Sequence, residues 1–360
     1  MMRAMIAMSG GVDSSVAALL MKEGGYDCTG VTMRLYRESG YPTSCEKSCC
    51  SDADEEYAAL VCWQLGIAHE SMCFSKSFEQ AVIREYEAGR TPNPCIDCNR
   101  FLKFDALLEQ AKKAGYDILA TGHYARTAYS EELRRWQLFM AVDEKKDQSY
   151  VLYMLTQEQL RCLRFPLGAL HKSEVRQLAQ AHKLVNAEKR DSQDICFIPD
   201  GDYAGFIRCR TGKRYPDGDI LDQDGNTVGK HQGLLRYTIG QRRGLGFAAG
   251  EPRYVIGKDP VSNTLLIGPE SALYRRELLT SAFNWLSIPK PDAPIRAFAR
   301  TRYHQRAAAC TVYPLPGDEV RIVFDEPQRA ITSGQAVVLY HEDMVLGGGT
   351  IKEFPSGMSE

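Results

Sequence analysis

The stretch Ser9-Gly10-Gly11-Val12-Asp13-Ser14-Ser15 follows a short apolar run at residues 3–8 and precedes a helical pattern over residues 14–22. Glycines allow the backbone to approach an anion closely, and the N-terminus of the following helix offers unpaired N–H groups. The stretch lacks both the Gly-Lys-Ser/Thr ending of a Walker A loop and the Gly-x-Gly-x-x-Gly of a dinucleotide-binding turn. It predicts an anion-binding loop at a strand–helix junction; the alternative is a tight turn with serine caps.

Strand and helix patterns alternate on the carboxyl side of this loop. We expect strands over residues 27–36, 69–73 and 117–122, and helices over residues 54–65, 77–88 and 101–114. Strands that alternate with helices at this spacing form a parallel sheet with right-handed crossovers. The sequence therefore predicts an α/β fold, a Rossmann-like doubly wound parallel sheet, as a catalytic domain over residues 1–205.

Beyond residue 205 the pattern changes to short apolar runs separated by turn residues. We expect a small central domain over residues 206–280 and a C-terminal β-barrel over residues 281–360, with residues 289–294 as a linker. The barrel strands are expected over residues 295–303, 309–313, 319–324, 336–341 and 344–351.

The composition is that of an ordinary globular protein. Of the 360 residues, 44% are hydrophobic and 25% are charged, which excludes disordered and fibrous classes. No apolar run reaches the ~18 residues of a membrane span, and the early loop leaves no room for a leader peptide, so we expect a cytoplasmic protein without membrane contact. The net charge is −2, but residues 161–258 hold 17 basic and 11 acidic side chains. This basic segment favours contact with a phosphate backbone.

Eleven of the twelve cysteines divide into two kinds, and Cys209, which stands among basic residues, is assigned to neither. Five stand in apolar patterns and are expected to be buried as small hydrophobic residues: Cys28, Cys62, Cys73, Cys162 and Cys310. Others stand in polar or proline-flanked stretches: Cys45, Cys49, Cys50, Cys95, Cys98 and, further on, Cys196. A helix that starts near Asn99 would lower the pKa of the Cys98 thiol through its dipole. Structural zinc is an alternative, in which Cys49 and Cys50 supply a second pair.

The loop at residues 9–15 resembles the PP-loop of ATP pyrophosphatases. The resemblance implies that ATP is split to AMP and pyrophosphate while a substrate oxygen is adenylated, and that Asp13 helps to hold Mg²⁺. The ATP-binding positions that it implies are Ala7, Met8, Ser9, Gly10, Gly11, Val12, Asp13, Ser14, Met33 and Gly122.

Further motifs follow in a fixed order: residues 93–99, 121–124, 146–150, 191–197, 237–246 and 299–303. Together with the loop they resemble the bacterial-type tRNA-uridine 2-sulfurtransferases, or tRNA-specific 2-thiouridylases, from residue 4 to about residue 351. The resemblance implies that ATP adenylates the C2 oxygen of the wobble uridine. It also implies that Cys196 carries a persulfide from a sulfur-carrier protein or cysteine desulfurase relay, with Cys98 as the partner thiol. Either the pair closes to a disulfide as sulfide is released, or the persulfide attacks directly.

The chain departs from the family pattern at Cys95, where many members carry an acid. That acid is the proposed proton shuttle, so its role is in doubt here. Cys95, Cys98 and Cys196 form a three-thiol set, which related PP-loop thiolases use to hold a [4Fe–4S] cluster with one open iron. We therefore hypothesise such a cluster as a second cofactor. Cys45, Cys49 and Cys50 have either an accessory redox or metal role or no role.

A strand over residues 295–303 would place Arg296, Phe298, Arg300 and Arg302 on one face and apolar residues on the other. A solvated strand face is the alternative to RNA contact. The family resemblance implies tRNA contacts at Asn93, Pro94, Cys95, His123, Asp147, Gln148, Ser149, Arg302, Tyr303 and Gln335. The target uridine must then leave the anticodon stack to reach the sheet edge.

Two other functions compete with this interpretation. One is another PP-loop adenylating activity, a ligase or amidotransferase that acts on a small molecule, for which no cysteine pair or basic barrel is needed. The other is a non-enzymatic RNA-binding protein with a degenerate nucleotide loop and a structural metal. The intact loop at residues 9–15 argues against the second.

Overall fold

The computed structural model describes residues 1–35, 52–74, 83, 93–191, 203–246 and 251–352. The N-terminal part is built on five strands: β1 (Arg3–Ala7), β2 (Asp27–Leu35), β3 (Ala68–Phe74), β4 (Ile118–Ala120) and β7 (Leu163–Arg164). They pair in the order β3-β2-β1-β4-β7, and every pairing is parallel. The predicted parallel sheet is confirmed, and its strand order reverses direction between β1 and β4.

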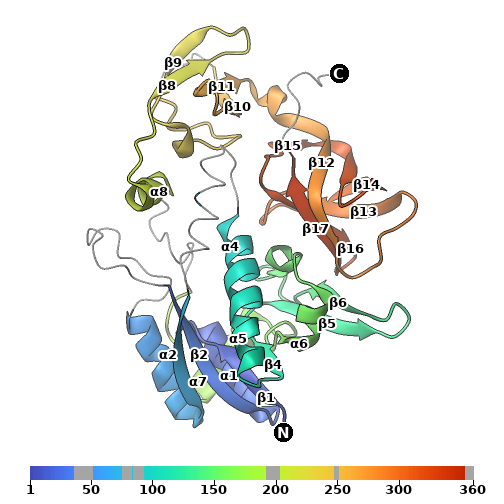
Figure 1. The fold of residues 1–360 in the computed structure, drawn as a ribbon. Coiled ribbons are helices and arrows are strands. Elements are labelled where there is room, and N and C mark those ends of the chain that lie inside the picture. Colours follow the sequence, from blue (N-terminus) through green and yellow to red (C-terminus); the bar gives the residue numbers. More distant parts are fainter. Residues whose placement is uncertain (36–51, 75–82, 84–92, 192–202, 247–250, 353–360) are drawn as a thin grey trace.

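Helices cover both faces of this sheet (Figure 1). One group consists of α1 (Val12–Glu23), α2 (Asp52–Leu65) and α7 (Lys172–Ala181); the other of α4 (Pro94–Asp97), η2 (Cys98–Leu107) and α5 (Leu108–Lys113). Successive residues of β1 point to opposite faces. Ala4 and Ile6 pack with the first group, and Met5 packs with Leu107 and Leu108 of the second. Burial on both faces requires the continuous apolar sequence that β1 has.

The segments α4, η2 and α5 form one continuous helix, whose middle part is π-helical. Asn93 caps its start: the side-chain oxygen accepts a hydrogen bond from the backbone N–H of Cys95 at 3.1 Å, and Pro94 takes the first helical position. The expected start near Asn99 is therefore wrong. Cys95 lies in the first turn, and Cys98 lies inside the helix instead of ahead of it.

The central domain contains α8 (Tyr203–Thr211), the 3-10 helix η4 (Leu234–Arg236) and four strands: β8 (Gly218–Leu221), β9 (Thr227–His231), β10 (Tyr254–Asp259) and β11 (Thr264–Gly268). The strands pair in the order β10-β11-β8-β9. Ile220, Val255 and Leu265 form its buried centre. The small central domain indicated by the crowded turn residues is thus present.

The C-terminal barrel follows the 3-10 helix η5 (Glu270–Leu273) and has six strands: β12 (Tyr274–Trp285), β13 (Ile295–Arg300), β14 (Ala308–Pro314), β15 (Val320–Arg329), β16 (Ala336–His341) and β17 (Met344–Ile351). They pair in the order β12-β15-β14-β13-β16-β17, and β17 pairs with β12 to close the barrel. The predicted barrel is confirmed.

Two details of the barrel differ from the expectation. The boundary placed at residue 280 falls inside β12, and residues 289–294 connect β12 to β13 within the barrel. The three prolines in that connection resemble a linker between domains more closely than Gly268 and Pro269 do, although Gly268 and Pro269 come just before the barrel begins. On β13 the predicted alternation holds as far as Arg300, with Ala297 and Ala299 buried, but residues 301–303 lie beyond the strand.

A hairpin of the N-terminal part extends the barrel sheet. β5 (Ala125–Ser130) and β6 (Arg135–Met140) pair with each other, and β6 pairs with β17 through Phe139 with Met344 and Leu138 with Val345. The 3-10 helix η3 (Ser149–Leu152) and α6 (Gln157–Cys162) follow the hairpin. The catalytic domain and the barrel therefore share one eight-stranded sheet, a connection that the sequence analysis missed (Figure 1). None of the helices in the described ranges is both long enough and apolar enough to cross a bilayer.

Candidate active site

The loop at residues 9–15 leaves β1 and enters α1 with a geometry that requires glycine. Gly10 has a φ of +69°, and a Cβ there would lie 2.0 Å from the backbone oxygen of Asp54. Gly11 takes the N-cap position of α1, and the Ser14 hydroxyl donates to its carbonyl oxygen at 3.0 Å. The first N–H groups of α1 have no partners within the helix, so this position favours an anion.

Two residues near the end of the N-terminal domain hold the loop in place through hydrogen bonds. The Asn186 amide donates to the Gly10 carbonyl oxygen at 3.0 Å and to the Ser15 hydroxyl at 2.9 Å. Lys189 donates to the same carbonyl oxygen at 3.1 Å and pairs with Asp54 of α2. Neither residue was predicted from the sequence, because neither belongs to a recognisable motif.

Gly122 brings the end of β4 against the loop. A Cβ at Gly122 would lie 2.8 Å from the backbone nitrogen of Ser14 and 2.9 Å from the carbonyl carbon of Asp13. Ligands of open α/β sheets bind at the carboxyl ends of the strands where the strand order reverses, and β1 and β4 meet at this point. The other predicted ATP-binding residues lie close by in the fold: Ala7 ends β1, Met8 and Val12 are buried beside the loop, and Met33 belongs to β2.

The Asp13 carboxylate is held on one oxygen. Its Oδ1 accepts hydrogen bonds from the Tyr124 hydroxyl at 2.8 Å and from Lys172 Nζ at 2.6 Å. Burial and the neighbouring Asp13 carboxylate raise the pKa of Tyr124, so its hydroxyl remains a donor. Within the described ranges no side chain donates to Oδ2. A carboxylate oxygen beside a phosphate-binding loop fits Mg²⁺, which takes one or two carboxylates together with substrate phosphates.

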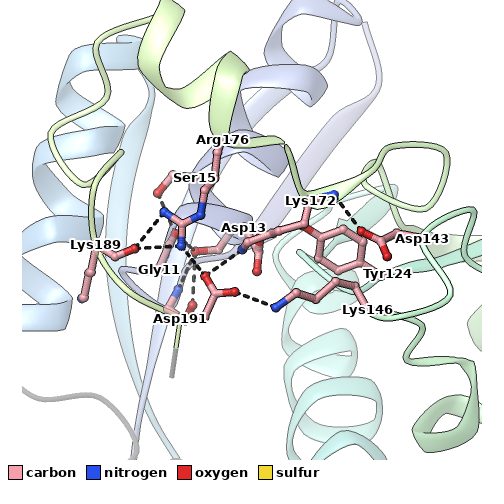
Figure 2. Close-up of polar contacts among 12 residues, drawn as sticks. Gly11, Asp13, Ser15, Tyr124, Asp143, Lys146, Lys172, Arg176, Lys189 and Asp191 are labelled. Atoms are coloured by element: carbon pink, nitrogen blue, oxygen red, sulfur yellow. Dashed lines mark hydrogen bonds and ion pairs between the residues drawn. The ribbon is translucent and has the colours of Figure 1, made fainter. Parts of the chain in front are cut away.

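Three cationic side chains converge on Asp191, next to Asp13 (Figure 2). Lys146 Nζ, Lys172 Nζ and Arg176 Nη2 lie 2.7, 2.9 and 2.8 Å from its carboxylate oxygens. Burial alone would raise the pKa of Asp191, but the hydrogen bonds from Lys146 and Lys172 outweigh it and lower the pKa to about 2. Lys172 and Arg176 were not predicted from the sequence; the available signal was the pair of basic residues in the first half of α7, the first long helix after the last strand of the sheet.

Cys95 and Cys98 are three residues apart on one helix and therefore share a face. Cys95 is partly exposed, Cys98 is 8% exposed, and neither is in a disulfide. Cys196, Cys45, Cys49 and Cys50 lie outside the described residues, as does most of the helix expected over 77–88. Among the described residues no three metal-binding side chains cluster, so the three-thiol set stays a prediction.

The remaining cysteines follow the expectation in part. Cys28, Cys62 and Cys310 are buried, and burial raises the pKa of Cys62 and of Cys310 to about 12. Cys73 is exposed and Cys162 partly so. The expectation of burial is therefore wrong for Cys73.

A path of contacts joins the loop to the thiol helix. Tyr124, which binds Asp13, makes two hydrogen bonds with Gln148. The Tyr124 N–H donates to Gln148 Oε1 at 3.0 Å, and the Tyr124 carbonyl oxygen accepts from the Gln148 backbone N–H at 2.9 Å. The Tyr303 hydroxyl donates to the carbonyl oxygen of Asp147 at 3.0 Å. Burial is the main cause that raises the pKa of Tyr303 to about 12, and the Asp147 charge adds to it. Tyr303 and Cys95 pack against the same hydrophobic core.

Several of the residues expected to contact tRNA make internal contacts in this structure. His123 is buried against Phe104 and Phe165, and burial lowers its pKa well below the usual value. Asp147 and Ser149 are also buried.

Arg302 is half-buried and donates to the carbonyl oxygens of Ile239 and Ala330, at 3.2 and 2.9 Å. Together with the Tyr303 contact to Asp147, this ties the residues after β13 to both the central and the catalytic domain. Gln335 precedes β16 and its N–H bonds the Thr332 carbonyl oxygen. Their roles with tRNA stay predictions.

Three family patterns match consecutive parts of the chain. Residues 2–200 match the tRNA methyl transferase HUP domain, residues 204–269 the tRNA methyl transferase PRC-barrel domain, and residues 275–351 the aminomethyltransferase beta-barrel domain. A protein named tRNA-specific 2-thiouridylase MnmA from Acetivibrio thermocellus is 45% identical and covers 97% of this chain and 99% of its own length. The chain belongs to the tRNA-specific 2-thiouridylase family.

Other members show the same extent of similarity. The proteins of that name from Carboxydothermus hydrogenoformans and Clostridium acetobutylicum are 46% and 44% identical, and the matches cover 98% and 97% of this chain and 98% and 99% of theirs. The solved NMN synthetase from Francisella tularensis is 17% identical over 59% of this chain and 77% of its own, with a TM-score of 0.33, which is too low to support a statement about this chain. Membership in the 2-thiouridylase family confirms the resemblance that the motifs indicated.

Proposed function

We propose that this chain catalyses the ATP-dependent 2-thiolation of the wobble uridine of tRNA, by adenylation of the uridine C2 oxygen and sulfur transfer from a cysteine persulfide. The path of contacts from Asp13 through Tyr124 to Gln148, and from Asp147 to Tyr303, which packs against the same core as Cys95, carries the proposal. This path joins the predicted ATP loop, the segment predicted to contact tRNA and the thiol helix. The names of the relatives point to the same reaction.

The first half-reaction uses the loop at residues 9–15. The uridine C2 oxygen attacks the α-phosphorus of ATP, the bond from that phosphorus to pyrophosphate breaks, and pyrophosphate leaves. The N–H groups of α1 and the hydroxyls of Ser9 and Ser14 bind phosphate oxygens. Asp13 would hold Mg²⁺, which offsets the charge of the pyrophosphate. Met33 would lie beside the adenine, and Gly122 lets the end of β4 pack against the loop that holds the phosphates.

The second half-reaction uses the thiols. In one course the outer sulfur of a Cys196 persulfide attacks C2 and AMP leaves with the oxygen; the Cys98 thiolate then attacks Cys196, so that 2-thiouridine is released and a disulfide forms. In the other course Cys98 closes the disulfide first and releases hydrogen sulfide, which attacks C2. Both courses reduce the transferred sulfur and oxidise the cysteine pair, so an external thiol must reduce the disulfide after each turnover. The persulfide comes from a sulfur-carrier protein or a cysteine desulfurase relay in the cytoplasm.

A [4Fe–4S] cluster is an alternative way to present sulfide. Cys95 and Cys98 lie one helical turn apart, which suits two ligands, and Cys196 would be the third. A bound cluster would supply an open iron for sulfide. Iron and sulfide assays after anaerobic purification test this alternative: full thiolation by cluster-free protein excludes it.

Nucleoside mass spectrometry of tRNA tests the proposed function. Wild type, Cys98→Ala and Cys196→Ala are each incubated with ATP, a sulfur donor and unmodified tRNA. We expect 2-thiouridine with wild type and none with either variant, while Cys162→Ala, on α6, serves as the matched cysteine control and retains activity. Retained 2-thiouridine with Cys196→Ala would refute the persulfide role.

The same assay separates the rivals. A small-molecule ligase or amidotransferase would release pyrophosphate from ATP with ammonia or an amine acceptor and without tRNA. A non-enzymatic RNA-binding protein would release none under any condition. Pyrophosphate release that depends on tRNA supports the proposed function against both.

A further inference from the structure

Lys172 is the first residue of α7, and its ammonium group contacts Asp13 of the predicted ATP loop. Its Nζ is 2.6 Å from Asp13 Oδ1 and 2.9 Å from Asp191 Oδ1, and the side chain is 12% exposed (Figure 2). The backbone N–H of Lys172 donates to Asp143 Oδ2 at 2.9 Å, which fixes the start of the helix. The ammonium is therefore held in place from a rigid element, directly beside the first turn of α1.

Under the proposed function, Mg²⁺ and ATP would change the charges around Lys172. Asp13 Oδ2 would hold Mg²⁺, and the metal would share the charge of the carboxylate whose Oδ1 binds Lys172, so Asp191 would be the main carboxylate partner of the ammonium. Asp191 is already shared with Lys146 and Arg176, which leaves three cations around one carboxylate. A low-exposure ammonium needs an anionic partner, and phosphate oxygens at the N-terminus of α1 are the nearest candidates.

We propose that Lys172 contacts the polyphosphate chain of ATP and stabilises the pyrophosphate as it leaves, and that Asp191 is the positioning residue that aims it. This inference rests on the proposed use of ATP. Lys172 donates hydrogen bonds to phosphate oxygens and transfers no proton, while the bond from the α-phosphorus to pyrophosphate breaks. Charge builds up on that leaving group, so a fixed ammonium acts on it more strongly in the transition state than in bound ATP.

The other cations near the loop are engaged differently. Lys189 pairs with Asp54, contacts the Gly10 carbonyl oxygen and stacks on the ring of Tyr57, so it holds the loop from behind. Arg176 donates to the carbonyl oxygens of Ala187 and Lys189 as well as to Asp191. Lys172 differs from both because its partners are the carboxylates of Asp13 and Asp191, and Asp13 would also bind the proposed metal.

Ligand binding to the full chain tests the assignment without turnover. Isothermal titration calorimetry with α,β-methylene-ATP and with AMP, both with Mg²⁺, compares wild type with Lys172→Met, Lys172→Arg and the surface control Lys113→Met, whose lysine pairs with Glu109 on α5. We expect Lys172→Met to weaken the ATP analogue about tenfold or more, the size of a lost hydrogen bond to a charged group, and to leave AMP unchanged within about twofold. Lys172→Arg should recover part of the loss, and Lys113→Met should match wild type.

Other outcomes overturn the assignment. If Lys172→Met weakens the binding of the ATP analogue and of AMP equally, Lys172 shapes the loop and does not contact the polyphosphate. If neither affinity changes, Lys172 only forms ion pairs within the protein. Thermal unfolding with and without the analogue shows whether the variant is folded, and Lys172→Arg gives the same comparison if Lys172→Met is not. Failure of wild type to bind either nucleotide would instead contradict the proposed function.

Discussion

Arg300 and Asp147 join the barrel to the catalytic domain through a buried ion pair. Arg300 Nη1 on β13 lies 3.1 Å from Asp147 Oδ2, and the two side chains are 17% and 1% exposed. The second oxygen of Asp147, Oδ1, accepts the backbone N–H groups of Ala141 and Ser149, each at 3.1 Å. The pair therefore fixes the segment that also carries Lys146 and Gln148 of the candidate active site.

Breaking this ion pair should destabilise the joint between the domains. Arg300→Met leaves the Asp147 charge buried without its cation, and we expect a loss of about 3–5 kcal/mol in the free energy of unfolding. Arg296→Met is the matched control on the same strand, because Arg296 pairs with Asp325 in an exposed position and its loss should matter much less. Urea unfolding followed by tryptophan fluorescence measures both. Equal effects of the two variants would contradict the importance of the buried pair.

Gly122 should be intolerant of any side chain. In Gly122→Ala the added Cβ would lie 2.8 Å from the Ser14 nitrogen, so the loop or β4 must shift. We expect the affinity for an ATP analogue to fall about tenfold or more, since overpacking of this kind costs roughly 1–3 kcal/mol. Calorimetric titration measures the affinity, and circular dichroism shows whether the parallel sheet is retained. An unchanged affinity in folded Gly122→Ala would show that the loop does not bind the nucleotide in this arrangement.

The ion pairs of Asp191 should make the free energy of unfolding fall at acid pH. Its folded pKa of about 2 lies below the ordinary value of about 3.9, so its contribution is present above pH ~4 and is lost as the pH falls toward 2. Asp191→Asn should lower the melting temperature at neutral pH and flatten its decline between pH ~4 and 2. Differential scanning calorimetry over this range measures the slope, with Asp224→Asn in an exposed turn as the control. A wild-type slope in Asp191→Asn would mean that the three cations do not stabilise the carboxylate.

The shared sheet predicts that damage to β6 reaches the barrel. Leu138 is fully buried, pairs with Val345 of β17, and its N–H bonds the Ser287 hydroxyl at 3.0 Å. Leu138→Ala should cost about 2–5 kcal/mol, as for other buried leucines. Hydrogen exchange should show faster opening in β17 as well as in β5 and β6. Tyr129→Ala, at an exposed site on β5, is the control; loss of protection confined to the hairpin would show that the two domains open independently.

Local patterns of residues are enough to predict the class of the fold and the position of the nucleotide loop. The apolar runs at β1 and β2 are separated by a helix that begins after a glycine pair. Both faces of such strands must be buried, so the pattern predicts a parallel sheet covered by helices. The β-barrel followed from short alternating strands, and the family followed from the order of the motifs between Ser9 and Tyr303. These are local signals, readable within a few residues of each position.

The tertiary structure alone decided which residues meet. Lys172, Asp191 and Asp13 are far apart in the chain and form one site because α7 returns to the start of α1, a contact for which no local pattern exists. The hairpin at β5 and β6 could not be predicted because its strands are stabilised by pairing with β17. The helix was expected to start near Asn99 because the Asn93 cap becomes evident only with the helix that follows. Burial of Asp147 likewise depends on Arg300 of a distant strand. Each of these charges would be costly to bury alone. Folding brings it next to a partner of opposite charge, and this partner is distant in the sequence.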